Sequence, residues 1–203
     1  MSPAADSRSE WSAARGQQHR LKRVAILRVA SVQFEERGYA GTSLADIAIE
    51  LGISNNALYH YFKNKEELAY CCVMRAQDSI EAHIDAGDSD GSTGIEKVEA
   101  FMDSLLSSST EGSPLPLRLT YALTKAHNSE VRARDEGHRS SVVEFVRIGL
   151  RDGTIRQCDP VLLADFILAG TYSMYRRQQN RAGDIDTRAV VSAILLGVKI
   201  APC

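Results

Sequence analysis

The ten residues from Ser54 to Lys63 combine short amides, hydroxyls, an imidazole and an ammonium group, and no acidic side chain lies among them. On a helix, Leu58, Tyr61 and Phe62 share one face, so the polar groups fall on the opposite face. An ordinary solvated helix face usually favours Glu and Lys, whereas amides suit a negatively charged partner and the edges of nucleic-acid bases. The alternative is a plain helical hairpin with the same core. The outward face consists of Ser54, Asn55, Asn56, Tyr59, His60 and Lys63.

Catalytic and metal-binding chemistry finds little support in the sequence. No histidine lies in a Ser/His/Asp, HExxH or Cys/His arrangement, and no glycine-rich phosphate loop follows a strand pattern. The cysteines show no CxxC spacing, which favours reduced structural thiols and leaves a redox sensor as the alternative. We therefore expect no enzyme activity, no metal and no cofactor. The residues concerned are His19, His60, His83, His127 and His138, and Cys71, Cys72, Cys158 and Cys203.

The composition is typical of a globular protein, with 44% hydrophobic and 25% charged residues in a chain of 203. No apolar run approaches the ~18–20 residues that a membrane span needs, and the first residues lack the apolar core of a signal peptide. We expect a cytoplasmic protein without a membrane partner. The formal net charge is only −2, but the stretch from Arg8 to Arg28 holds six basic residues and one acid, Glu10, and forms a modest basic arm.

Apolar residues at helical spacing predict a first helix from about His19 to Gly38, where a residue of left-handed conformation commonly ends a helix. Three further helices follow, each preceded by a side chain that can cap its first turn. The capping residues are Ser43 with Asp46 three residues on, Ser54, and Asn64 with Glu67 placed to reach back to it. The fourth helix then runs toward Ile84.

The remainder of the chain is predicted to be helical as well. Residues 86–94 (AGDSDGSTG) are typical of a loop, and breakers such as His127 with Asn128 separate the later helices. No stretch alternates apolar and polar residues over the length of a strand, so the expected fold class is all-α. The later helices are expected near 94–109, 115–126, 130–151, 160–179 and 186–199.

The stretch Leu44–Lys63 fits a helix-turn-helix, in which two helices meet at a steep angle across a turn of three or four residues. Ala48 is the small residue needed where the helices cross, and Gly52 can adopt a positive φ at the turn. Apolar residues seal the angle at Ile47, Leu51, Ile53, Leu58 and Tyr61. We expect a disordered arm at 1–17, a three-helix DNA-binding domain at 18–64, and a helical domain at 65–203 joined to it through the long fourth helix.

The stretch from Ile26 to Leu68 resembles the N-terminal signature of the tetracycline-repressor (TetR) family of transcriptional regulators. The rest of the chain is compatible with the all-helical C-terminal domain of that family. Two places depart from the family pattern: Gln33 replaces a usual Leu, and Asn55 with Asn56 replaces a frequent Lys-Gly. Residues in register are Gly38, Tyr39, Thr42, Ser43, Ile47, Ala48, Leu58, Tyr59, His60, Tyr61, Phe62, Lys65 and Glu66.

Helix geometry and the resemblance together predict which residues contact DNA. Asn can pair with the N6/N7 edge of adenine, so Asn55 and Asn56 are expected to read bases, and Ala57 to touch a thymine methyl group. The phosphate contacts are expected from Tyr59 and His60, from a helix N-terminus at Thr42 or Ser43, from Lys65, and from Arg20, Lys22 and Arg23. The DNA-binding set is Thr42, Ser43, Ser54, Asn55, Asn56, Ala57, Tyr59, His60 and Lys65.

Adequate specificity usually needs two helix-turn-helix units about one turn of DNA apart, so a homodimer is expected. Two helical stripes with small residues in their middle are the predicted interface, and intramolecular packing of the same stripes is the alternative. The resemblance implies that such helices from two subunits form a four-helix bundle. The interface residues are Leu162, Phe166, Ala169, Gly170, Ser173, Val190, Ala193, Ile194 and Gly197.

The middle helices are then expected to hold a small, mostly apolar effector, although ordinary core packing explains any one of the same residues. The function that results is a ligand-responsive transcriptional regulator, a repressor that binds a palindromic operator in double-stranded DNA and is released by the effector. The alternative is a helical protein-interaction module without sequence-specific DNA binding. The effector-binding residues are Phe101, Leu105, Arg118, Tyr121, His138, Phe145 and Tyr172.

Overall fold

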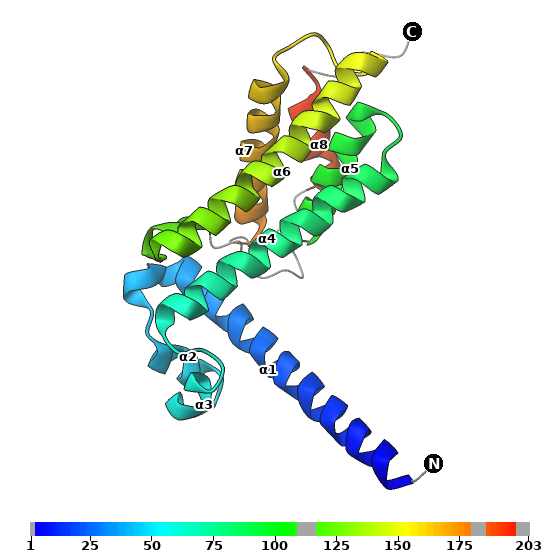
Figure 1. The fold of residues 1–203 in the computed structure, drawn as a ribbon. Helices are drawn as coiled ribbons and strands as arrows, with labels where there is room; N and C mark the ends of the chain where they lie inside the picture. The colour runs from blue at the N-terminus through cyan, green and yellow to red at the C-terminus, as the bar shows by residue number, and fades with distance from the viewer. Residues whose placement is uncertain (1–2, 109–116, 180–185, 198–203) are drawn as a thin grey trace. The chain divides into compact units, whose positions relative to one another are not determined.

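The computed structural model describes residues 3–108, 117–179 and 186–197, and these form helices joined by short connections (Figure 1). The all-α prediction is therefore confirmed for this part of the chain. The elements in order are α1 (Pro3–Gly41), α2 (Leu44–Glu50), α3 (Asn55–Tyr59), α4 (Lys65–Asp90), α5 (Gly94–Ser107), the 3₁₀ helix η2 (Leu117–Ala122), α6 (Lys125–Asp152), α7 (Pro160–Gln179) and α8 (Thr187–Leu195).

The chain divides into two compact units. The first contains α1, α2, α3, the start of α4 as far as Cys72, and η2, and the second contains the rest of α4 with α5 to α8. The sequence places this boundary before the long helix, at residue 64, whereas the division falls inside α4. The first turns of α4 belong with α1 because the buried Cys72 thiol donates a hydrogen bond to the Leu27 carbonyl at 3.6 Å.

Helix α1 begins at Pro3, within the segment for which the sequence predicts a disordered arm. Pro is well tolerated in a first helical turn, and the Ala, Arg, Glu and Gln residues that follow are good helix formers. Near its other end, Gly38 has φ 72° and ψ 170°, which interrupts the helix before it continues to Gly41. This conformation is nearly exclusive to glycine and differs from the left-handed helical one that the sequence predicts.

The predicted helix caps of the first unit are confirmed. Ser43 and Asp46 form a reciprocal capping box, and the hydrogen bonds from Ser43 hold the pKa of the Asp46 carboxyl below its usual range. The Ser54 hydroxyl accepts a hydrogen bond from the Ala57 N–H at 3.1 Å. At the start of α4, Asn64 caps the Glu67 N–H at 2.8 Å, and the Glu67 carboxylate accepts from the Lys63 N–H at 2.6 Å.

Two predicted breaks of the second unit are wrong. Helix α4 continues to Asp90, so the loop predicted at residues 86–94 shrinks to the three residues before Gly94. The glycines there serve close packing, since a Cβ on Gly87 would lie 2.8 Å from the Lys97 carbonyl oxygen on α5. Helix α6 begins at Lys125 and includes His127 and Asn128, which lie in its first turn, where polar side chains disturb a helix least.

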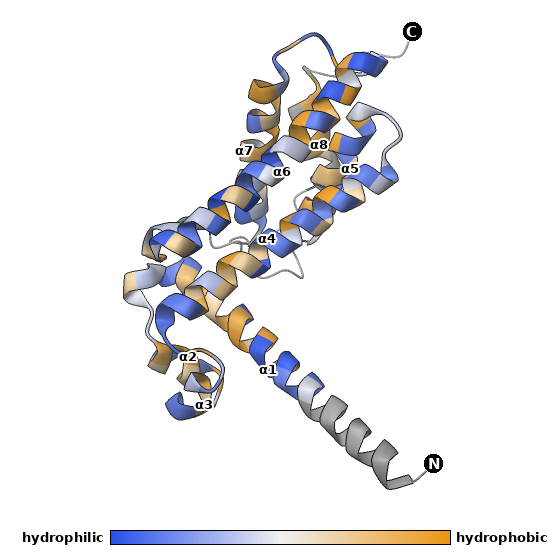
Figure 2. Ribbon diagram, viewed as in Figure 1, coloured by the Kyte–Doolittle hydropathy of each residue, from blue (hydrophilic) through white to orange (hydrophobic). Residues whose placement is uncertain are grey.

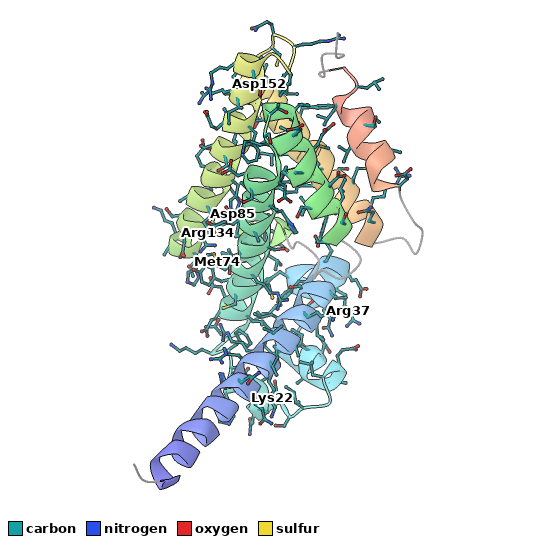
Figure 3. All side chains as sticks on the ribbon, turned by 90° about the vertical axis from the view of Figure 1, so that its right-hand side faces the viewer. Lys22, Arg37, Met74, Asp85, Arg134 and Asp152 are labelled. Carbon is teal, nitrogen blue, oxygen red and sulfur yellow. The ribbon has the colours of Figure 1, made fainter. Side chains whose placement is uncertain are left out.

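The start of α5 is fixed on the end of α6 by backbone contact and by side-chain caps. The Gly94 N–H donates to Asp152 at 2.8 Å, and the Ile95 N–H donates to the Thr154 hydroxyl at 3.3 Å. A Cβ on Gly94 would overlap backbone atoms of Gly149, so the two helices touch at a pair of glycines. Figure 3 shows Asp152 at this end of the unit, close to the first turn of α5.

The distribution of hydrophobic residues agrees with the packing of the second unit. Figure 2 shows hydrophobic residues recurring along α5, α7 and α8, whereas the first half of α6 is largely hydrophilic. The core of the second unit is built around side chains with at most 1% exposure on α4, α5, α6 and α7. They include Ile80, Phe101, Met102, Leu105, Leu106, Val142, Val146 and Ile167.

Candidate nucleic-acid interface

Helices α2 and α3 form the predicted helix-turn-helix. Gly52 has φ 63° at the turn, and the Ile53 N–H donates to the Ala48 carbonyl at 3.0 Å, which closes the turn onto the end of α2. Ala48 is 2% exposed, and both Ile47 and Leu58 are fully buried between the helices. The small residue, the turn glycine and two residues of the apolar seal, Ile47 and Leu58, therefore lie where the sequence places them. The other three residues of the predicted seal, Leu51, Ile53 and Tyr61, are partly exposed.

The outward surface of α3 carries the side chains that the sequence assigns to DNA contact. Asn55, Asn56 and His60 are exposed, Tyr59 is half-exposed, and Ala57 is partly covered. Within the described residues, the side chains of Asn55 and Asn56 make no hydrogen bond to the protein. We call this surface, from Ser54 to His60, the recognition face. Its amides are free to bond an external partner, and its helix has only five residues, with His60 as the C-cap.

Arg23 is partly buried and contacts the chain that follows α3. Its guanidinium donates to the Tyr61 carbonyl at 3.0 Å, lies 4.3 Å from the centre of the Phe62 ring, and donates to the Cys71 sulfur at 3.1 Å. Arg23 therefore has a structural role within the unit, and the phosphate contact expected of it stays a prediction. His19 adds a second contact from α1 by stacking on Tyr61 with ring centres 4.7 Å apart.

The residues around the start of α2 differ in how far they reach solvent. Thr42 is 1% exposed, and its hydroxyl donates to the carbonyls of Gln33 and Gly38, both at 3.0 Å. Its side chain therefore fastens the turn between α1 and α2 and is not placed to contact DNA. Ser43 is exposed and caps α2, while Arg20 and Lys22 are exposed on α1 (Figure 3 labels Lys22).

Lys65 sits against an aromatic ring at the start of α4. Its Nζ lies 4.2 Å from the centre of the Tyr39 ring, and burial lowers the pKa of this ammonium group. Burial, with the nearby Glu66 and Tyr121, raises the pKa of the Tyr39 hydroxyl. The ammonium group is thus held in one place by a cation–π contact and is only partly covered.

The residues predicted to bind an effector are divided between the two units. Phe101, Leu105 and Phe145 are buried in the second unit, His138 is buried with its pKa lowered by that burial, and burial raises the pKa of Tyr172 far above its ordinary value. Tyr121 instead belongs to the first unit, because η2 packs against α1. Its side chain is 70% exposed. The side chain of Arg118 lies outside the described residues.

The α7 stripe predicted for the dimer interface is open to solvent. Leu162 and Phe166 are 68% and 61% exposed, and Ala169 and Ser173 on the same face are exposed as well. Buried residues such as Ala164 and Thr171 occupy the opposite face of the helix. Gly170 is partly covered, Ala193 and Gly197 are exposed near α8, and the side chains of Val190 and Ile194 lie outside the described residues.

Sequence reasoning missed one polar residue of the second unit, Gln77. It is 1% exposed on α4, in a stripe with Val73, Ile80 and Ile84, and its amide oxygen accepts no hydrogen bond from the described residues. The signal was present in the sequence as an amide at a core position of an apolar helical stripe. In the described part of the chain, no cluster of three or more His, Cys, Asp or Glu side chains could hold a metal ion, and no helix combines the length and apolar character that a membrane span requires.

Comparison with known proteins agrees with this geometry. Residues 26–69, which include the helix-turn-helix, match the model of the family "Bacterial regulatory proteins, tetR family". An HTH-type transcriptional regulator of Staphylococcus aureus (strain USA300) is 33% identical over 81 residues, which cover 40% of this chain and 44% of that protein. The curated relative is therefore matched over less than half its length.

Solved structures extend the likeness to both units. PfmR, a TetR family regulator of Thermus thermophilus, is 26% identical with a TM-score of 0.71, and the match covers 83% of this chain and 93% of PfmR. AibR in complex with isovaleryl coenzyme A and operator DNA has a TM-score of 0.72 at 22% identity, covering 86% of this chain and 96% of AibR, and shows likeness of fold. The first unit therefore carries the sequence signature of the TetR family of bacterial regulatory proteins, and the helical architecture after it is similar to that of solved TetR family regulators.

Proposed function

We propose that this protein is a transcriptional regulator that binds a palindromic operator as a homodimer, acts as a repressor, and is released by a small, mostly apolar effector. The observation that carries the proposal is the recognition face, an exposed surface without acids whose amides have no partner among the described residues. The helix-turn-helix holds this face rigidly from behind through Leu58. AibR, which has a similar fold, has been solved with operator DNA and isovaleryl coenzyme A, and supports DNA and a ligand as partners of this chain without indicating the chemistry of that ligand.

Base reading by Asn56 predicts a specific loss. Asn56→Ala is expected to remove about 1–3 kcal/mol of discrimination at one base pair of each half-site, because one bidentate amide contact disappears. The measurement is selection of bound duplexes from a random pool, followed by titration of single-base variants of the selected site. Gln157→Ala, which truncates an exposed amide of the second unit, is the matched control and should leave the preference unchanged.

An unchanged sequence preference for Asn56→Ala would remove the base-reading role. A selected site without two-fold symmetry would argue against the dimer. If no duplex is preferred over random DNA at moderate salt, the helical protein-interaction module becomes the better explanation of the fold.

The proposed dimer rests on the exposed stripe of α7. Phe166 and Leu162 leave large apolar surfaces in water at a place where small residues allow a second helix to approach closely. Phe166→Glu is expected to weaken dimerisation roughly a thousandfold, because a two-fold interface places the charge in it twice at about 2 kcal/mol each. Light scattering across a dilution series measures the change.

Tyr121→Glu is the control for this variant, since Tyr121 is a similarly exposed aromatic residue of the other unit. It should leave the assembly intact. A dimer of unchanged strength in Phe166→Glu would move the interface away from α7, and operator binding by a stable monomer would refute the dimeric mode itself.

A further inference from the structure

In the second unit, the buried amide of Gln77 lies beside Asp135, an exposed residue of α6. Gln77 on α4 donates from its Nε2 to the Asp135 carboxylate at 2.7 Å. One turn further along α6 lies His138, which is 8% exposed, and Tyr172 on α7 is close enough to Asp135 for the carboxylate to help raise the pKa of its hydroxyl. Hydrogen-bonding groups of α4 and α6 therefore meet at Gln77, and Tyr172 lies within electrostatic range of Asp135.

The orientation of the Gln77 amide follows from its partner. An ionised carboxylate only accepts hydrogen bonds, so the NH₂ group must face Asp135 and the carbonyl oxygen must point away from it. That oxygen, Oε1, is buried and accepts no hydrogen bond from the described residues. A buried polar atom without a partner costs about 1–3 kcal/mol, so a donor that reaches Oε1 binds favourably.

Charge around the cluster favours a neutral or cationic donor over an anion. Asp135 and Glu81 both act on His138, and burial keeps the pKa of that imidazole below its ordinary value. Arg134 also acts on His138, but it is already paired with Asp78 and lies 3.7 Å from Glu81 (Figure 3 labels Arg134). A carboxylate or phosphate brought to Gln77 would therefore meet two acceptors, the amide oxygen and Asp135.

We propose that the effector of this regulator is an apolar molecule bearing a hydroxyl or amino group, which donates a hydrogen bond to Gln77 Oε1 beside Asp135, His138 and Tyr172. This inference rests on the proposed function and specifies the ligand class. The apolar residues that share the α4 stripe with Gln77, namely Val73, Ile80 and Ile84, suit the hydrocarbon part of such a molecule. The amide provides the selectivity, because an analogue that lacks the donor leaves Oε1 unpaired.

The test uses the full-length protein and matched probes that share a hydrocarbon skeleton. An amine, an alcohol and a carboxylate are compared on octyl, 4-phenylbutyl and cyclohexylmethyl skeletons, with binding followed by thermal unfolding and by calorimetry. On at least one skeleton, the amine or the alcohol should bind about tenfold or more tightly than the carboxylate, as one hydrogen bond would give. Preference for the carboxylate, or binding by no probe, overturns the proposal, and the amine and alcohol arms tell the two donors apart.

Gln77→Met keeps the length of the side chain and removes the acceptor. The variant also loses the hydrogen bond from Nε2 to Asp135, so the readout is probe preference and not unfolding temperature, and the preference for the donor probe should be lost. Gln157→Met, at an exposed glutamine, is the control and should retain the preference. If Gln77→Met keeps the preference, Oε1 does not bind the ligand, and the proposal fails.

Operator binding is measured separately on the same preparation. A protein that selects a palindromic duplex but fails the probe comparison would refute the ligand class and leave the proposed function standing. A protein that prefers the donor probes but no DNA sequence would refute the regulator and leave the Gln77 site standing.

Discussion

Replacing Gly94 by alanine is expected to lower the free energy of unfolding of the second unit by about 3 kcal/mol, the upper end of the range for overpacking. A Cβ at this position would overlap the backbone nitrogen and Cα of Gly149 and approach the Phe145 carbonyl. Backbone atoms cannot rotate away as a flexible side chain can, so the first turn of α5 would have to separate from α6. Urea denaturation followed by circular dichroism measures the loss.

The chain offers a matched control for Gly94→Ala on α6. Gly137 is an exposed glycine inside that helix, and a Cβ there would meet nothing within 4 Å. Gly137→Ala should therefore stabilise the protein by roughly 0.5–1 kcal/mol, the helix-propensity difference between the two residues. Equal effects of the two substitutions would show that α5 and α6 do not approach each other closely at Gly94.

Truncating Leu58 to alanine is expected to cost about 2–5 kcal/mol and to abolish specific DNA binding. Leu58 is fully buried and is the one buried residue within α3, so it anchors the recognition face against α2. A helix of five residues cannot hold its own position, because isolated helices shorter than ~12–15 residues are marginal in water. The cavity therefore releases the element that presents Asn55 and Asn56.

Ile49→Ala removes a side chain of the same volume class from α2, where Ile49 is 77% exposed. Its effect on stability should stay within about 0.5 kcal/mol, as is usual for surface positions. The comparison needs denaturation curves for both variants and a gel shift with the selected duplex for Leu58→Ala. Sequence-specific binding of normal strength by a folded Leu58→Ala would show that the recognition face does not depend on this contact.

The sequence was sufficient to predict those features that depend on residues close to one another in the chain. The caps at Ser43, Ser54 and Asn64 were predictable because a capping side chain bonds an N–H only two or three residues away. Gly52 was predictable because the turn between α2 and α3 requires a positive φ. Residue spacing alone therefore predicted the helix-turn-helix and its outward amides.

Predictions failed where a residue acts through a distant partner. Gly87 was predicted to lie in a loop, yet it lies inside α4, where α5 packs closely against it. The structural role of Arg23 was not predicted, because two of its N–H groups bond Tyr61 and Cys71, 38 and 48 residues further along the chain. Neither contact leaves a local signature, since any exposed helix can carry an arginine or a glycine.

The order of apolar, capping and turn residues by itself determined that this chain is helical and that its second and third helices meet in a helix-turn-helix. It also determined which side chains face outward there. These features follow from periodicity and from hydrogen bonds between residues a few positions apart. Only the tertiary structure decided that Thr42 is buried, that η2 joins the first unit, and that the oxygen of Gln77 is enclosed without a donor among the described residues. Burial and pairing are properties of atoms brought together from distant parts of the chain, and spacing along one segment does not contain them.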